Sequence, residues 1–173
     1  TAPDGQQAGG LSEMKIGIVS DSHGDTNAID VMLSHPQAKG VEHWLFAGDI
    51  AADAEYLAMV SEVPVSKVAG NNDWPDIELS DTQVLELAGH RILLTHGHRF
   101  GVQYTTNIVE RAAQEVEADL VIYGHTHVAD LSVGELTVLN PGSVARPRDE
   151  SRGSFMVAQL LPGKKPKVKL IRL

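Results

Sequence analysis

The chain has 173 residues, of which 42% are hydrophobic and 21% are charged, and its net charge at pH 7 is −9. These values are ordinary for one soluble globular domain, and no apolar run approaches the ~20 residues that span a bilayer. The negative charge argues against a nucleic-acid-binding surface, and the absence of cysteine excludes disulfides, thiolate zinc sites and a cysteine nucleophile.

The first 13 residues, TAPDGQQAGGLSE, are rich in small and polar residues. They have neither the basic segment nor the apolar segment of a secretory signal. We therefore expect a flexible leader over residues 1–13 and a single domain over residues 14–173. Because no export signal is recognised, the expected location is the cytoplasm.

The first half of the domain reads as alternating strands and helices. Strands are predicted at 14–20, 42–47 and 63–69, and helices at 26–34 and 53–60, from the spacing of apolar residues. This order, with short connections, predicts a parallel sheet. In such a sheet, the ligand site lies at the carboxyl ends of the strands.

The second half reads mainly as strands. A hairpin is predicted from 83–87 and 91–95, a helix over 101–117 and a buried strand over 119–123. Further short strands are predicted at 130–133, 136–139, 154–160 and 166–172. A parallel half followed by a largely antiparallel half predicts two sheets packed face to face, with helices outside.

Short polar motifs follow five of the apolar runs. They contain five of the eight histidines, and they are DSHG at 21–24, GD at 48–49, GNND at 70–73, THGH at 95–98 and GHTH at 124–127. Asp, Asn and His side chains placed repeatedly at strand ends are typical of a cluster of divalent cations.

The motifs contain enough ligands for two cations. On an extended segment, residues two apart project to the same side, so Asp21 and His23 can hold one ion, and His125 and His127 repeat that spacing. The carboxylate of Asp49 can bridge two ions. The complete set is Asp21, His23, Asp49, Asn71, His96, His125 and His127.

Nitrogen and oxygen ligands without sulfur suit Mn²⁺, which we favour, as well as Ni²⁺, Fe²⁺, Zn²⁺ and Co²⁺. Two such ions ~3.5–4 Å apart can clamp a phosphoryl group and convert a bridging water to hydroxide.

The ordered motifs, together with NPGS at 140–143, resemble the calcineurin-like metallophosphoesterase superfamily, and within it the small YfcE-type phosphodiesterases of bacteria and archaea. The resemblance implies an α/β fold, a four-layer α/β/β/α sandwich of two mixed β-sheets flanked by helices. It also implies two divalent transition-metal ions. By motif, Asp21, His23 and His127 would bind the first ion, Asn71, His96 and His125 would bind the second, and Asp49 would bridge them.

The resemblance also assigns roles beside the metals. His98 matches a position near the substrate phosphate, and Asp73 would buttress the Asn71 loop. At Asn72 the chain departs from the pattern, because many family members have histidine there and the small subgroup often has cysteine. An amide can donate a hydrogen bond but cannot transfer a proton near neutral pH.

The expected function is a dinuclear metal-dependent phosphodiesterase that uses a metal-bridging hydroxide on a small phosphate ester, without nucleic-acid or membrane partners. Whether it forms a homo-oligomer stays open. The alternative is a binding scaffold of the same fold, like a retromer subunit of this superfamily. The complete ligand set favours the enzyme, and the acidic charge disfavours a nuclease.

Other polar residues have simpler interpretations. His35, His43 and His90 lie outside the motifs and are expected to be structural, and NPGS is first of all a turn sequence. Arg146 and Arg148 either bind a phosphate or are solvated loop residues, and the sequence leaves both readings open.

Overall fold

The computed structural model describes residues 12–73 and 79–173, which form two five-stranded sheets. The first sheet has the order β10-β9-β1-β2-β3 and the second the order β4-β5-β6-β8-β7. The first contains β1 (Met14–Val19), β2 (His43–Phe46), β3 (Val65–Lys67), β9 (Ser154–Leu160) and β10 (Lys167–Arg172). The second contains β4 (Thr82–Leu87), β5 (His90–Thr95), β6 (Leu120–Ile122), β7 (Asp130–Ser132) and β8 (Thr137–Asn140).

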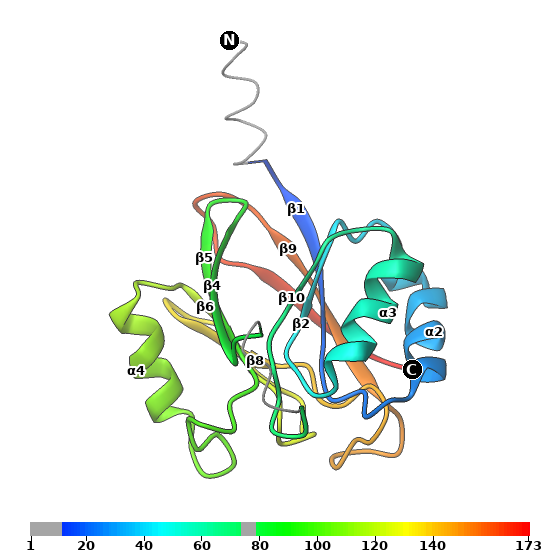
Figure 1. The fold of residues 1–173 in the computed structure, drawn as a ribbon. Helices are drawn as coiled ribbons and strands as arrows, with labels where there is room; N and C mark the ends of the chain where they lie inside the picture. Colours follow the sequence, from blue (N-terminus) through cyan, green and yellow to red (C-terminus); the bar gives the residue numbers. More distant parts are fainter. Residues whose placement is uncertain (1–11, 74–78) are drawn as a thin grey trace.

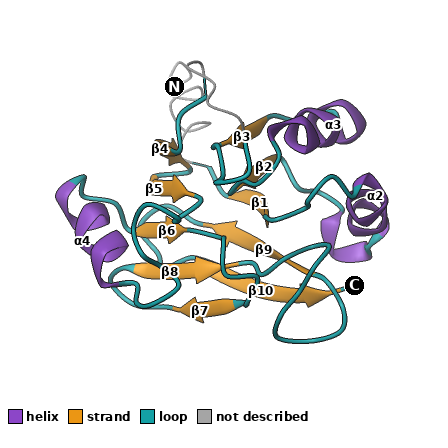
Figure 2. Cartoon of the chain, turned by 60° about the horizontal axis from the view of Figure 1, so that its bottom comes forward, coloured by secondary structure: helices purple, strands orange, loops and turns teal. Residues whose placement is uncertain are grey.

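Helices cover the outer faces of both sheets (Figures 1 and 2). Helices α2 (Thr26–Ser34) and α3 (Ala51–Ser61), with the short 3₁₀ helix η1 (Pro36–Ala38), lie on the side of the first sheet, and α4 (Asn107–Glu115) lies on the side of the second. The expected four-layer α/β/β/α sandwich is therefore confirmed. In the part of the chain that the structure describes, no helix is long and apolar enough to cross a membrane.

Both faces of the central strands are buried, which explains their nearly continuous apolar sequences. In β2, Leu45 packs into the core between the sheets, whereas Trp44 and Phe46 pack into the core beneath α2 and α3. Gly17 in β1 makes room for the indole, because a Cβ at this position would lie 2.3 Å from the Trp44 ring. The parallel strands β1, β2 and β3 therefore end at one edge of the first sheet.

Most pairings of the second half are antiparallel, as expected, but the second sheet is mixed. Strands β5, β6 and β8 are parallel to one another, and only β4 and β7 pair antiparallel. The cause is α4, which carries the chain from β5 back to the start of β6, as a parallel pair requires. The first sheet in turn gains antiparallel pairs from β9 and β10.

The predicted helix over 101–117 is too long, because α4 begins only at Asn107. Gly101 has φ +63°, and turns closed by Phe100 N–H to Gly97 O at 2.9 Å and by Tyr104 N–H to Gly101 O at 3.0 Å fill the preceding segment. Val102 still packs beside α4, which is why it matched the helical stripe. Most of the expected leader, residues 1–11, lies outside the described residues.

Candidate metal centre

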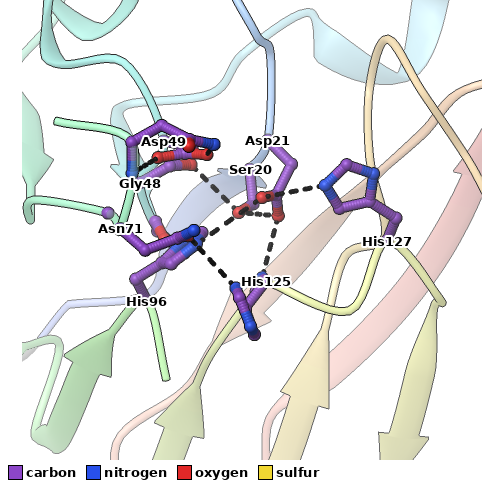
Figure 3. Close-up of polar contacts among 12 residues, drawn as sticks. Ser20, Asp21, Gly48, Asp49, Asn71, His96, His125 and His127 are labelled. Atoms are coloured by element: carbon purple, nitrogen blue, oxygen red, sulfur yellow. Dashed lines mark hydrogen bonds and ion pairs between the residues drawn. The ribbon is translucent and has the colours of Figure 1, made fainter. Parts of the chain in front are cut away.

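The five polar motifs meet at one edge of the two sheets, at the bottom of Figure 1. Asp21, Asp49 and Asn71 follow β1, β2 and β3 of the first sheet, and His96 and His125 follow β5 and β6 of the second. Because parallel strands end at the same edge, ligands from both halves of the chain come together (Figure 3).

Asp21 lies at the centre of the cluster and is fully buried. Its Oδ2 atom accepts hydrogen bonds from Ser20 Oγ at 2.6 Å and from the His125 amide at 3.0 Å. Its Oδ1 atom accepts no hydrogen bond within the described residues, yet it lies 3.3 Å from His127 Nε2 and 3.7 Å from His96 Nε2. A buried carboxylate oxygen without a partner is costly, and a cation would satisfy it.

Two of the histidines are oriented by backbone carbonyls. The Nδ1 atom of His96 donates to Ala47 O at 2.7 Å, and Nδ1 of His127 donates to Arg146 O at 2.8 Å. Since a carbonyl can only accept, the proton lies on Nδ1 and the Nε2 lone pair faces the cluster. This is the usual support for a metal-binding imidazole.

The donor atoms form two overlapping groups. Asp21, His23 and His127 make one group, and Asp21, Asp49 and His96 make the other, with the atoms of each group within 4.8 Å of one another. Beside the second group, Asn71 Oδ1 lies 3.0 Å from His96 Nε2 and 3.2 Å from His125 Nδ1.

All seven ligands predicted from the sequence are thus brought together, and the donors suit two divalent ions. Distance places Asp21 in both groups, while Asp49 Oδ2 also approaches His23 Nε2, at 3.9 Å. Either carboxylate is therefore positioned to bridge, and the assignment of Asp49 stays a prediction.

The electrostatics of the cluster favour the deprotonated forms of Asp21, His23 and His125, but not that of His127. Burial opposes ionisation of Asp21, but contacts with His127, His96 and Ser20 outweigh it and lower the pKa of this carboxyl. Burial lowers the pKa of His23 and that of His125, whereas the contact with Asp21 raises the pKa of His127. Ionised carboxylates and neutral imidazoles are the forms that bind metals.

The ligand loops have left-handed backbone, so the argument from an extended segment is wrong. The φ angles are +58° at Asp21, +51° at His23, +73° at His125 and +63° at His127. The side chains converge through tight turns after the strands rather than through strand alternation. Gly124 shows how close the loops are, because a Cβ there would lie 2.1 Å from Ser20 Oγ and 2.8 Å from Asp21 Oδ2.

Asp73, expected to buttress the Asn71 loop, accepts hydrogen bonds from Gly70 N at 2.7 Å, Ala51 N at 2.6 Å and Ile50 N at 3.2 Å. It thereby caps α3, where Ile50 at the N-cap has no capping side chain of its own.

Sequence reasoning missed Asp53, which is buried in the first turn of α3. Its carboxylate accepts hydrogen bonds from Ser22 Oγ and, at 2.7 Å, from the Gly24 amide, so it holds the DSHG loop. An acidic residue four positions after Asp49, at a helix start, was the available signal.

The two other proposed catalytic residues differ in position. Asn72 donates hydrogen bonds to both carboxylate oxygens of Asp49, one from its backbone N–H at 2.9 Å and one from its side-chain Nδ2. The ring of His98 lies 5.4 Å from the ring of His96 and 6.3 Å from that of His125, measured between centroids. Burial, followed by the charge of His96, lowers the pKa of His98.

The NPGS motif forms hydrogen bonds with the loops that carry the candidate ligands. Asn140 Nδ2 donates to Gly124 O at 3.2 Å and to Thr126 Oγ1 at 2.9 Å, and Ser143 Oγ donates to Asp21 O at 2.7 Å. These contacts are with protein groups that carry the ligands, in keeping with a structural role for the motif.

The three remaining histidines make contacts elsewhere in the fold. His35 accepts from Gln37 N, His43 bonds Ser66, and His90 contacts the Asp119 carboxylate and Leu161 O.

An open pocket of about 370 Å³ lies over the cluster. It is lined by six of the seven candidate ligands, all except His96, and by Asn72, Gln103, Thr126, Val128 and Arg148. A pocket of this size suits a small ligand, which would lie against the donors.

Comparison with known proteins gives a consistent answer. The family model of the calcineurin-like phosphoesterase superfamily domain matches residues 14–161. The probable metallophosphoesterase YsnB of Bacillus subtilis is 32% identical over 149 residues, covering 85% of each chain. The phosphodiesterase YfcE of Escherichia coli is 28% identical over 165 residues, covering 82% of this chain and 85% of that one.

Among solved structures, Vps29 of Entamoeba histolytica in complex with Zn²⁺ superimposes with a TM-score of 0.72 at 21% identity, covering 92% of this chain and 98% of that one. At this identity the likeness shows the fold alone. The family model spans most of the chain and agrees with the convergence of its motifs, and the chain belongs to the calcineurin-like phosphoesterase superfamily.

Proposed function

We propose that the protein is a phosphodiesterase that uses two divalent transition-metal ions, with Mn²⁺ the favoured ion. The observation that carries the proposal is the convergence of seven ligands around the buried, unpartnered Oδ1 atom of Asp21. Asp21, His23 and His127 would hold one ion, and Asn71, His96 and His125 would hold the other, with Asp49 shared between them.

When bound, the two ions supply positive charge to the phosphoryl oxygens and lower the pKa of a water molecule so that hydroxide is available near neutral pH. The protein's own contribution is orientation. Ala47 O and Arg146 O fix the rings of His96 and His127, and Asp73 and Asp53 hold the loops that carry Asn71 and His23.

Two further side chains are proposed to meet the substrate. Asn72 lines the pocket and can donate a hydrogen bond to a phosphoryl or leaving-group oxygen. His98 is a neutral imidazole at neutral pH because its pKa is lowered, so it would act as a hydrogen-bond partner of the phosphate or, once protonated, as an acid.

A diester is favoured over a monoester because the relative YfcE is a phosphodiesterase. The alternative is a binding scaffold, and the similarity of the fold to Vps29 is the observation behind it. The complete and oriented ligand set favours catalysis, and because Vps29 itself was solved in complex with Zn²⁺, hydrolysis rather than metal binding alone separates the two functions.

The test combines metal analysis with hydrolysis assays. Protein reconstituted with Mn²⁺ should bind two ions and hydrolyse bis(p-nitrophenyl) phosphate faster than p-nitrophenyl phosphate. Asp49→Ala should abolish both properties, whereas the control His43→Gln, at a histidine that bonds Ser66, should retain them. Protein that binds no metal after reconstitution with Mn²⁺, Ni²⁺ and Zn²⁺, or that hydrolyses neither ester, would contradict the proposal and favour the scaffold.

A further inference from the structure

The loop between β8 and β9 is drawn in orange at the bottom of Figure 1. Its acidic residues and Arg148 have different surroundings. Arg172 of β10 binds the loop's acidic residues, with Nη2 2.8 Å and Nη1 3.1 Å from the two carboxylate oxygens of Asp149, and Nε 3.8 Å from Glu150. Arg148, immediately before them, lines the pocket over the ligand cluster. Its guanidinium forms no ion pair or hydrogen bond with any residue in the described ranges 12–73 and 79–173.

Hydrogen bonds hold Arg148 and the residues on both sides of it. The Arg148 amide donates to His127 O at 2.9 Å, and His127 Nδ1 returns a hydrogen bond to Arg146 O at 2.8 Å. On the other side, Asp149 accepts from the Ala129 amide at 2.8 Å. The backbone of Arg148 is therefore attached to the GHTH loop at His127.

The pocket gives this arginine no partner of its own. Gln103, Thr126 and Val128, which also line it, are uncharged, and the carboxylates that line the pocket, Asp21 and Asp49, are candidate metal ligands. A guanidinium presents several donors in a planar fork that matches a phosphate or carboxylate. Arg148 is therefore placed to receive an anionic group from the ligand.

Arg148 is distinct from the groups that would hold the reacting phosphate. The reacting phosphoryl group would lie against the candidate metal ligands, whereas Arg148 lines the same pocket without belonging to either group of metal donors. Resting on the proposed phosphodiesterase function, we propose that Arg148 determines specificity by binding a second anionic group, a phosphate or a carboxylate, on one arm of the diester substrate.

Binding of inert ligands tests this independently of turnover. Isothermal titration of Mn²⁺-loaded protein would compare 3-phosphonopropionate, which carries a second anion, with propylphosphonate, which does not. We expect the wild type to prefer 3-phosphonopropionate by about 10-fold or more, the range that charged hydrogen bonds give, and Arg148→Gln to lose that preference. Arg148→Lys should restore part of it, because a lysine keeps the charge but not the fork.

Kinetics extend the test to the substrate class. p-Nitrophenyl phosphodiesters whose second arm is ethyl, 2-carboxyethyl or 2-phosphoethyl share one leaving group and differ only in the second anion. Arg148→Gln should raise KM for the two anionic substrates, by about 10-fold or more, and change the ethyl ester less than threefold. The comparison of carboxylate with phosphate identifies the preferred anion.

The matched control is Arg152→Gln, at an exposed arginine of the same loop, which should behave as the wild type. If Arg148→Gln weakens all ligands and substrates equally, Arg148 acts on the reacting phosphate and the proposal is overturned. Equal binding of both phosphonates by the wild type overturns it as well. Absence of turnover of all three diesters by the wild type, with the phosphonate preference intact, would refute the phosphodiesterase and not the anion site.

Discussion

The Asp73 carboxylate accepts a hydrogen bond from the Ala51 amide at 2.6 Å, so the GNND motif caps the helix that follows the GD motif. The same carboxylate holds the amide of Gly70, one residue before the proposed ligand Asn71. The position of Asn71 and the start of α3 therefore depend on one side chain.

Asp73→Ala should leave these amides without their acceptor and destabilise the protein by about 1–3 kcal/mol. It should also weaken metal binding on the Asn71 side. Asp73→Asn, which retains one acceptor oxygen, should lie between the wild type and Asp73→Ala. Urea unfolding of the metal-free proteins measures the first effect and Mn²⁺ titration the second; a stable Asp73→Ala variant with normal metal affinity would contradict both.

The two histidines of GHTH should belong to different ions. His127 lies beside Asp21 and His23, and His125 lies beside Asn71. Each single alanine variant should therefore retain about one ion per chain, because it removes a ligand from one site only. Elemental analysis after gel filtration checks this, with His35→Ala as the control; loss of both ions in either variant would refute the split.

Asn72 should limit hydrolysis of esters with poor leaving groups. A positioned general acid contributes about 10²–10⁴-fold, and the Asn72 amide, which donates to Asp49, cannot transfer a proton. We expect kcat/KM to fall steeply as the pKa of the leaving group rises, and Asn72→His to speed alkyl diesters more than nitrophenyl diesters. A shallow slope for the wild type that steepens in His98→Ala would instead identify His98 as the acid.

Asp53 should act as a positioning residue for the DSHG loop. Asp53→Ala removes the acceptor of Ser22 and Gly24, and we expect it to lower stability by about 1–3 kcal/mol and to weaken the ion held by Asp21 and His23. The matched control is Asp30→Ala, which loses one surface contact with Tyr56. Equal metal affinities for Asp53→Ala and the control would show that the loop does not need this anchor.

The Asp149–Arg172 pair should stabilise the protein in a pH-dependent way. Hydrogen bonding to Arg172 lowers the pKa of Asp149 from 3.8 to about 2, so its contribution is complete above the unfolded-state pKa. That contribution is lost as the pH falls through the folded-state value. The difference in urea midpoint between wild type and Asp149→Asn should thus be present at neutral pH and shrink between about pH 4 and pH 2. A difference that is constant over this range would contradict the assignment.

Much of this site can be predicted from the sequence because the ligands are local and ordered. Each ligand motif follows an apolar strand, and five such motifs in one order leave few arrangements open. The layers of the fold can also be predicted, because neighbouring apolar residues of one strand, such as Trp44 and Leu45, must both be buried and therefore need a layer on each face of the sheet.

The remaining features depend on contacts that distant segments make. Left-handed backbone at Asp21 and His125 has only a weak local signal, because Asp and His adopt it more often than most residues but still rarely. The roles of Asp53 and Asp73 depend on where α3 begins, and the parallel pairing of β5 with β6 depends on the path of α4. Periodicity cannot distinguish Val102 in a packed turn from Val102 in a helix.

The cluster draws Asp21, Asp49 and Asn71 from the first sheet and His96 and His125 from the second. A cation shared among them would cross-link the two sheets, so that neither could separate from the other without releasing the ion. Binding to the folded chain alone adds about 2.7 kcal/mol when the free ion is at 100 times its Kd. Chelation would then lower the melting temperature of the whole domain as well as its activity, and the stability of the sandwich would depend on the concentration of available metal.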